Sequence, residues 1–227
     1  MKLQRSGMQT GRRLLLLWSF TALALAQAKH PVSGRVIAPV MSAAGADWLD
    51  RGERESEENP AKALTMLEIQ PGMTVCDLGA GSGYYTVRLS RLVGPAGKVY
   101  AVDIQQRMLD LLDLRLKRQG IGNVITVRGG EQNPNLPPNS QDLILLVDVY
   151  HEFAHPQQML RRMREALKDN GRLVLLEYRA EDPAVPIRPE HKMSIAQVRM
   201  ELEPEGFVVD RVLDGLPWQH IFICRKK

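Results

Sequence analysis

Three side chains in the stretch DVYHEFAHP, residues 148–156, have types and spacing that could hold a metal ion: His151, Glu152 and His155. In zinc proteases the H-E-x-x-H pattern puts both histidines one turn apart on a helix, and the glutamate activates a metal-bound water. Here Pro156 follows His155 directly. A proline disfavours the α conformation in the preceding residue and favours the first turn of a helix. We therefore expect a helix to begin at Pro156, both histidines to lie in the loop before it, and no metal at this segment.

A second group of residues could hold a ligand against bare backbone: Gly79, Gly81 and Gly83, preceded by Asp77. Alternate glycines let the chain turn tightly, and a ligand can lie against them without meeting a Cβ atom. The dinucleotide pattern G-x-G-x-x-G would need a glycine where Tyr84 stands. The Gly-Lys-Ser/Thr of a phosphate-binding loop is absent as well. The spacing therefore argues against a nicotinamide or flavin dinucleotide.

These residues fall at the ends of elements that alternate regularly along the chain. Apolar runs typical of buried strands alternate with runs that have apolar residues at helical spacing. Strands are expected at residues 74–79, 98–103, 123–129, 141–149, 171–179, 206–214 and 219–226. Helices are expected near 42–50, from Asn59-Pro60 onward, and at 84–93, 105–120, 156–168 and 194–203.

Five alternations of strand and helix predict a parallel sheet with helices on both faces. Because parallel crossovers are almost always right-handed, the expected class is a doubly wound α/β domain. The last two strands are close in sequence and should pair antiparallel. The prediction is a Rossmann-like, mostly parallel seven-stranded sheet with an antiparallel last strand. Ligands of such sheets bind at the carboxyl ends of the strands, where the strand order reverses.

The pattern Asp77-x-Gly79-x-Gly81-x-Gly83 resembles the first motif of class I S-adenosylmethionine-dependent methyltransferases. The resemblance covers roughly residues 57–227. It implies that S-adenosylmethionine is the cofactor and that the acid before the loop takes its ammonium group, directly or through water. The bare N–H groups of the loop would then serve its carboxylate.

The resemblance extends to the ends of the next two strands. Asp103, 20 residues after Gly83, closes the second strand, where a carboxylate can accept both ribose hydroxyls. By the same resemblance Ile104 packs on the adenine. Gly130 and Glu131 lie where the family usually holds the adenine amino group.

Further residues correspond to the substrate-facing side of the family. Asp148, Tyr150 and His151 follow the fourth strand, beside the expected position of the methyl group. His151 could act as a general base for an oxygen or nitrogen nucleophile or could only shape the pocket, and both roles stay open. The segment EHKMS resembles one that places His191 and Lys192 toward the substrate.

Residues 1–28 have the layout of a secretory signal peptide: a basic start, an apolar run and a small-x-small cleavage site. The expected location is therefore exported or periplasmic, or membrane-anchored if the leader stays uncleaved. A misassigned start would make the chain cytoplasmic. The whole chain has 30 basic and 26 acidic residues, a net charge of +4, and the leader carries the basic excess. The balanced remainder favours a small-molecule acceptor over nucleic acid.

The expected domains are the leader at residues 1–28, an extension at 29–56 and a methyltransferase domain at 57–227. Trp48 and the charges after it either cover the cofactor as a lid or form a solvated helix. Cys76 and Cys224 are either free and buried or paired. The predicted function is methyl transfer to a small molecule. A module that binds the cofactor without transfer and an exported zinc hydrolase using HEFAH are the alternatives, and the oligomeric state is left open.

Overall fold

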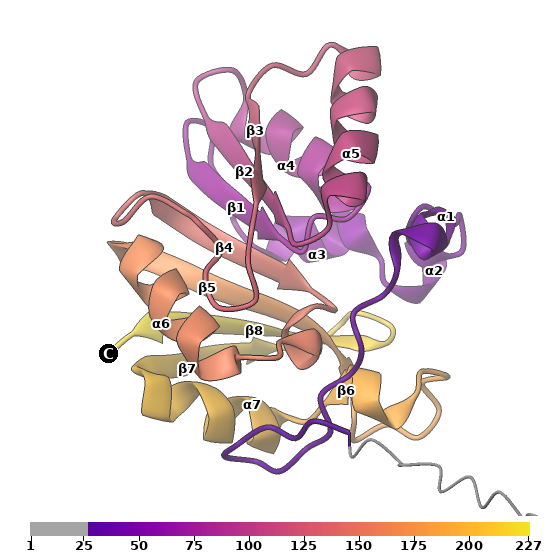
Figure 1. The fold of residues 1–227 in the computed structure, drawn as a ribbon, viewed down its shortest axis with the longest axis vertical. Helices are drawn as coiled ribbons and strands as arrows, with labels where there is room; N and C mark the ends of the chain where they lie inside the picture. The colour runs from indigo at the N-terminus through magenta and orange to yellow at the C-terminus, as the bar shows by residue number, and fades with distance from the viewer. Residues whose placement is uncertain (1–26) are drawn as a thin grey trace, which may run out of the picture.

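The computed structural model describes residues 27–227 (Figure 1). Of the predicted leader, only residues 27 and 28 fall within the described part. Among the described residues, no helix combines the length and the apolar character that crossing a membrane requires.

Strands and helices alternate along the chain, close to the predicted positions. The strands are β1 (Thr74–Leu78), β2 (Lys98–Asp103), β3 (Val124–Arg128), β4 (Gln141–Val147), β5 (Leu167–Arg179), β6 (Lys192–Met193), β7 (Phe207–Leu213) and β8 (Gln219–Lys226). The helices are α1 (Ala46–Leu49), α2 (Arg54–Glu57), α3 (Pro60–Met66), α4 (Tyr84–Val93), α5 (Gln106–Gln119), α6 (Pro156–Ala166) and α7 (Ile195–Leu202). Short 3-10 turns are η1 (Ala43–Gly45), η2 (Tyr150–Glu152), η3 (Pro189–His191) and η4 (Glu203–Glu205).

The strands of the described chain form one sheet in the order β3-β2-β1-β4-β5-β8-β7, and the short β6 pairs with β5. The first five strands run parallel, while β8 is antiparallel to both β5 and β7. This confirms the mostly parallel, doubly wound sheet with an antiparallel last strand, to which β6 adds a short extra strand. The strand order reverses between β1 and β4, so this is where a ligand is expected.

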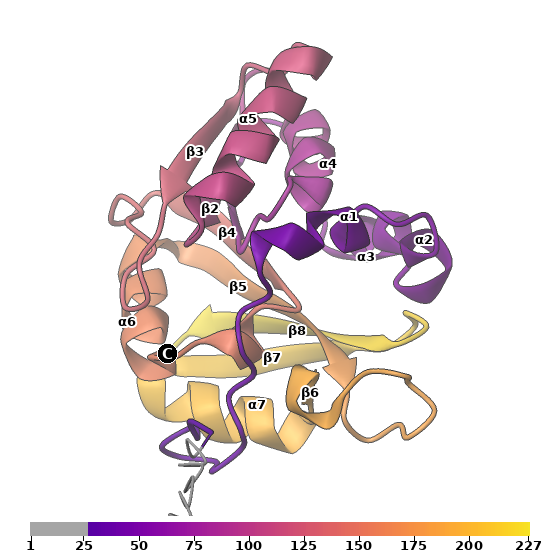
Figure 2. The same cartoon turned by 45° about the vertical axis from the view of Figure 1, so that its right-hand side comes forward.

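Residues of the central strands point alternately into two cores, one on each face of the sheet. On β4, Leu143 and Leu145 pack with α3 and α4, whereas Ile144 and Leu146 pack with α6 and α7. Figure 2 shows the two sets of helices on opposite sides of the strands. Burial on both faces explains why these strands are continuously apolar in sequence.

The two cysteines are both buried and free. Cys76 lies on β1 and Cys224 on β8, and β4 and β5 separate the two strands in the sheet. The alternative of a disulfide between them is therefore excluded in this fold.

Two helices also differ from the expectation. The helix after Pro156 ends at Ala166 instead of 168, because Leu167 already pairs with Gln141 at the start of β5. The short helix α2 was not expected, since RESE has no apolar repeat. A buried guanidinium holds it instead: Arg54 Nε donates to Glu58 Oε2 at 2.7 Å.

The N-terminal segment, drawn in indigo, runs from beside α7 and β6 up to α1 (Figures 1 and 2). Its anchor is the buried carboxylate of Glu201 on α7. Arg35 Nε lies 2.9 Å from Glu201 Oε1, and Ser33 donates its hydroxyl to the same carboxylate. Arg35 Nη1 also donates a hydrogen bond to the carbonyl of His151 at 2.9 Å. Arg35 therefore connects α7 to the loop after β4.

Arg35→Ala should lower the free energy of unfolding by about 3–5 kcal/mol, because it leaves Glu201 as a buried charge without its cation. Urea denaturation followed by circular dichroism measures the loss. The control is Arg162→Ala, which removes a half-exposed ion pair with Glu165 and should cost at most about 1 kcal/mol. Equal losses in the two variants would contradict the anchoring role of Arg35.

Candidate functional site

A cavity of about 700 Å³ opens where β1, β2 and β4 end. Its volume is in the range of about 300–1,000 Å³ that small-molecule sites usually have. Residues lining it include Met41, Trp48, Leu49, Gly79, Gly81, Asp103, Ile104, Met108, Gly130, Glu131, Asp148, His151, Glu152 and His191. The strand ends, the N-terminal segment and the loop before β6 all contribute to its walls.

The glycine turn after β1 forms one side of the cavity. Gly79 and Gly81 have φ values of 80° and 53°, a left-handed conformation that favours glycine. A Cβ atom on Gly79 would lie 2.4 Å from Val149 Cγ2, and one on Gly81 would lie 2.7 Å from Leu49 Cδ1. The third glycine, Gly83, precedes α4 and is not among the lining residues.

Asp77 lies behind the glycine turn and is not among the lining residues. It is buried, and Thr86 donates its hydroxyl to Asp77 Oδ2 at 2.6 Å. Burial raises the pKa of Asp77 to about 6, although the hydrogen bond from Thr86 lowers it. The carboxylate therefore fastens α4 to β1.

Asp103 joins the end of β2 to the glycine turn. Its Oδ2 accepts the N–H of Gly81 at 2.9 Å, and its Oδ1 accepts the N–H of Gln105 at 2.8 Å. Burial raises the pKa of Asp103, and these backbone donors oppose the shift. Each carboxylate oxygen keeps a second lone pair, so the group can still accept hydrogen bonds from a ligand in the cavity. Ile104 lines the cavity beside it.

Gly130 and Glu131 line the cavity after β3. Glu131 is mostly exposed, and its Oε2 lies 3.6 Å from His155 Nε2. The backbone N–H of Gly129 donates to the carbonyl of Asp103 at 3.0 Å, which holds this loop next to the end of β2.

Residues 43–58 of the N-terminal segment pack over the glycine turn. Leu49 lies against Gly81, and Ser82 donates its hydroxyl to Asp50 at 2.9 Å. Trp48 lines the cavity, and the guanidinium of Arg51 lies 3.7 Å from the centre of its ring. The segment thus packs on the turn on one side, while Trp48 stays 46% exposed on the other.

Asp148 follows β4 and also lines the cavity. Its φ of 54° is uncommon for a residue other than glycine and costs of order 1–3 kcal/mol. Gln219 donates to Asp148 Oδ2 at 2.8 Å, while Oδ1 has no hydrogen-bond partner among the described residues. Burial, together with the nearby carboxylates of Glu58 and Glu177, raises the pKa of Asp148 well above its ordinary value.

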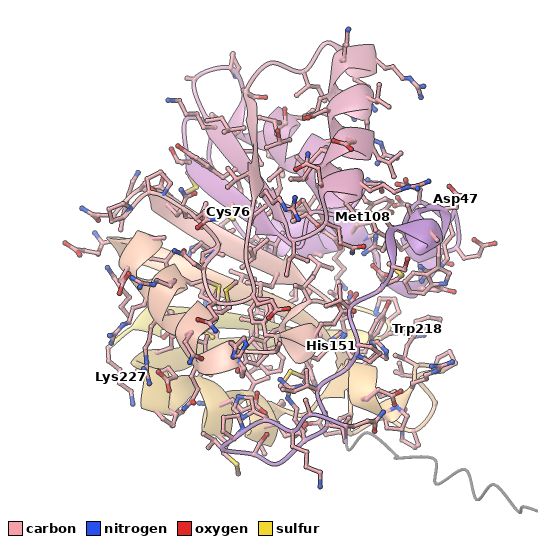
Figure 3. All side chains as sticks on the ribbon, in the orientation of Figure 1. Asp47, Cys76, Met108, His151, Trp218 and Lys227 are labelled. Carbon is pink, nitrogen blue, oxygen red and sulfur yellow. The ribbon has the colours of Figure 1, made fainter. Side chains whose placement is uncertain are left out.

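His151 is buried beside Asp148, with both ring nitrogens in contact. Its Nδ1 lies 2.6 Å from Glu177 Oε2, and its Nε2 lies 3.1 Å from His191 Nδ1. Glu177 is fully buried at the end of β5 and also accepts the N–H of Tyr150 at 3.0 Å. Figure 3 shows His151 beside the N-terminal segment.

Glu177 was not predicted as a site residue, and its only sequence signal is an acid at the end of an apolar strand.

The structure separates other predicted residues from the cavity. Tyr150 is buried in the core, in an edge-to-face contact with Phe153, and does not line the cavity. Lys192 donates to the carbonyls of Asp182 and Val185, away from the site. Of the pair in EHKMS, His191 alone lines the cavity.

The H-E-x-x-H stretch has the geometry that the proline predicts. Helix α6 begins at Pro156, and His155 is its N-cap residue with φ of −126°. His151 lies earlier, in η2. A zinc-protease site requires both histidines on one helix, and His151 and His155 do not share one.

Comparison with known proteins supports the same family. A family model described as a methyltransferase domain matches residues 69–213. The ubiquinone/menaquinone biosynthesis C-methyltransferase UbiE of Escherichia fergusonii is 36% identical over 111 residues, which are 48% of this chain and 44% of that protein. The match thus spans less than half the length of this relative.

Solved structures extend the likeness over most of the described chain. An S-adenosylmethionine-dependent methyltransferase from Aquifex aeolicus has a TM-score of 0.77 and 29% sequence identity, covering 82% of this chain and 98% of that one. The YcgJ protein from Bacillus subtilis shares the fold, with a TM-score of 0.59 and 16% identity over 74% of this chain and 97% of that one.

The family model covers more than half of the chain. This chain belongs to the methyltransferase domain family, in the class I fold that uses S-adenosylmethionine as its cofactor.

Proposed function

We propose that this protein transfers the methyl group of S-adenosylmethionine to a small-molecule acceptor bound in the same cavity. One observation carries the proposal: the glycine turn, Asp103 and His151 line one cavity, and the buried Glu177 holds His151 from behind. The name of the relative UbiE makes a quinone-like ring the first acceptor class to assay.

The cavity fits this cofactor on its own geometry. Gly79 and Gly81 have no Cβ atoms that would collide with Val149 and Leu49, so the turn keeps its tight shape at the wall of the cavity. Asp103 has lone pairs left for ribose hydroxyls. Ile104 and Met108 offer an apolar surface for the adenine, next to Gly130 and Glu131.

When bound, S-adenosylmethionine supplies an electrophilic methyl group and a good leaving group. The protein's own contribution is then mainly to position the acceptor for in-line attack. Glu177 holds a proton on Nδ1 of His151, which leaves Nε2 able to accept a proton from an oxygen or nitrogen nucleophile. Asp148 borders the same space, whereas Tyr150 takes no part from its place in the core.

Asp103→Ala should weaken S-adenosylmethionine binding at least about tenfold, because hydrogen bonds to a charged group are worth about 1.5–3 kcal/mol. Isothermal titration calorimetry on the purified chain measures the affinity. Asp113→Ala, an exposed acid on α5, is the matched control and should bind like the wild type. Undiminished binding by Asp103→Ala, or no binding by the wild type, would refute the proposed cofactor site.

Gly79→Ala should abolish cofactor binding at accessible concentrations, because the new Cβ atom collides with Val149 at the turn. Gly120→Ala places the same strain at a φ of 64°, but nothing lies within 4 Å of its Cβ atom. Binding calorimetry should therefore separate the two variants, and thermal melts should show both folded. If both lost binding equally, backbone strain rather than the shape of the turn would explain the loss.

His151→Gln should reduce methyl transfer by about 10²–10⁴-fold while the affinity for S-adenosylmethionine changes less than about threefold. Release of S-adenosylhomocysteine, measured over a panel of quinol, phenol, thiol and amine acceptors, gives the rate. Wild-type turnover in none of the classes, with cofactor binding intact, would favour a binding module without transfer activity.

A further inference from the structure

Cofactor binding leaves a group of side chains on the acceptor side of the cavity unexplained. The side chains of His151, Glu152 and His191 each offer one ligand atom, and these atoms all lie within 4.8 Å of one another. His151 Nε2 and His191 Nδ1 are 3.1 Å apart. With metal–ligand bonds of about 2.0–2.2 Å, tetrahedral ligand atoms are about 3.4 Å apart, so an ion fits among these three after small side-chain shifts.

We propose that His151, Glu152 and His191 bind one divalent transition-metal ion, of which Zn²⁺ is the first probe. Two imidazoles and one carboxylate form a ligand set typical of Zn²⁺, Fe²⁺ and related ions, whereas Mg²⁺ and Ca²⁺ prefer oxygen ligands only. Each of the three residues lines the cavity.

Glu177 supports this assignment from behind His151. Metal-binding histidines usually donate their second ring nitrogen to a carboxylate, which fixes the tautomer and the orientation of the ring. Glu177 Oε2 lies 2.6 Å from Nδ1 of His151, so the proton stays on Nδ1 and the lone pair of Nε2 points toward His191. Glu177 is fully buried and also accepts the N–H of Tyr150, so its carboxylate is held in the orientation that contacts His151.

The proposed site differs from the one that H-E-x-x-H suggests. It keeps the first two residues of the motif and replaces His155 by His191, which comes from η3, 40 residues after His151. His155 instead lies 3.6 Å from Glu131, on the cofactor side. The linear pattern therefore contains two of the three ligands, and the fold supplies the third.

Three protein ligands leave a coordination position open, as in catalytic metal sites. Because the three residues line the cavity, that position is available to an oxygen or nitrogen of the acceptor. With an ion bound, Nε2 of His151 would be a ligand, so the ion would promote deprotonation of the acceptor in place of the free imidazole. This consequence rests on the proposed methyl transfer, whereas metal binding itself does not.

The test titrates Zn²⁺ into the full chain, stripped beforehand with a chelator, in competition with a chromogenic chelator. One Zn²⁺ per chain is expected. His191→Ala and Glu152→Gln, which change half-buried residues, should each weaken binding at least about tenfold. Glu177→Gln should weaken it about 10–100-fold. Co²⁺ should give the visible absorption bands of a low-symmetry site, and His191→Ala should remove them.

His155→Ala is the matched control and should keep the Zn²⁺ affinity within about threefold. No stoichiometric Zn²⁺ in the wild type, or equal affinity in His191→Ala, would overturn the site and leave a plain hydrogen bond between the imidazoles. Loss in His155→Ala as large as in His191→Ala would also overturn it. Calorimetry with S-adenosylmethionine on the same samples distinguishes the two proposals. If the protein binds the cofactor but not Zn²⁺, only the metal site is rejected. If it binds Zn²⁺ but not the cofactor, only the proposed function is rejected.

Discussion

A single buried carboxylate, Glu177, determines how the loop after β4 is arranged. It has no solvent contact, and its two oxygens accept the N–H of Tyr150 and face Nδ1 of His151. A buried charge without donors would cost several kcal/mol, so loop conformations that withdraw these donors are strongly disfavoured. The wall of the cavity at His151 thus depends on hydrogen bonds to one buried carboxylate within the fold.

Much of the fold follows from local sequence patterns. The apolar runs predict the strands because both faces of a parallel sheet are buried, and Pro156 predicts the start of α6 because proline constrains its own φ and the residue before it. The glycine turn and Asp103 could be assigned to the cavity for a similar reason. In each case the signal lies within a few residues of the element that it describes.

The remaining features depend on contacts between distant residues. The pairing of Glu177 with His151 joins residues 26 positions apart, and His191 reaches the same cluster from a loop that has no regular pattern. The inward direction of Tyr150 and the place of Asp77 behind the turn depend on packing around them, which residue type alone does not encode. Helix α2 escaped prediction because an ion pair between Arg54 and Glu58 holds it rather than an apolar face.

Residues 43–58, which pack over the glycine turn, are held near both ends by side-chain hydrogen bonds. At the N-terminal end, Gln105 donates to the carbonyl of Met41 and accepts the N–H of Ala43. Near the C-terminal end, Tyr84 donates its hydroxyl to Glu55. A cofactor held beneath Trp48 and Leu49 would have to wait for this segment to lift before it could leave. The residence time of the spent cofactor would then be set by a local opening rate, and turnover could respond to ionic strength through the charged contacts of Asp50 and Glu55.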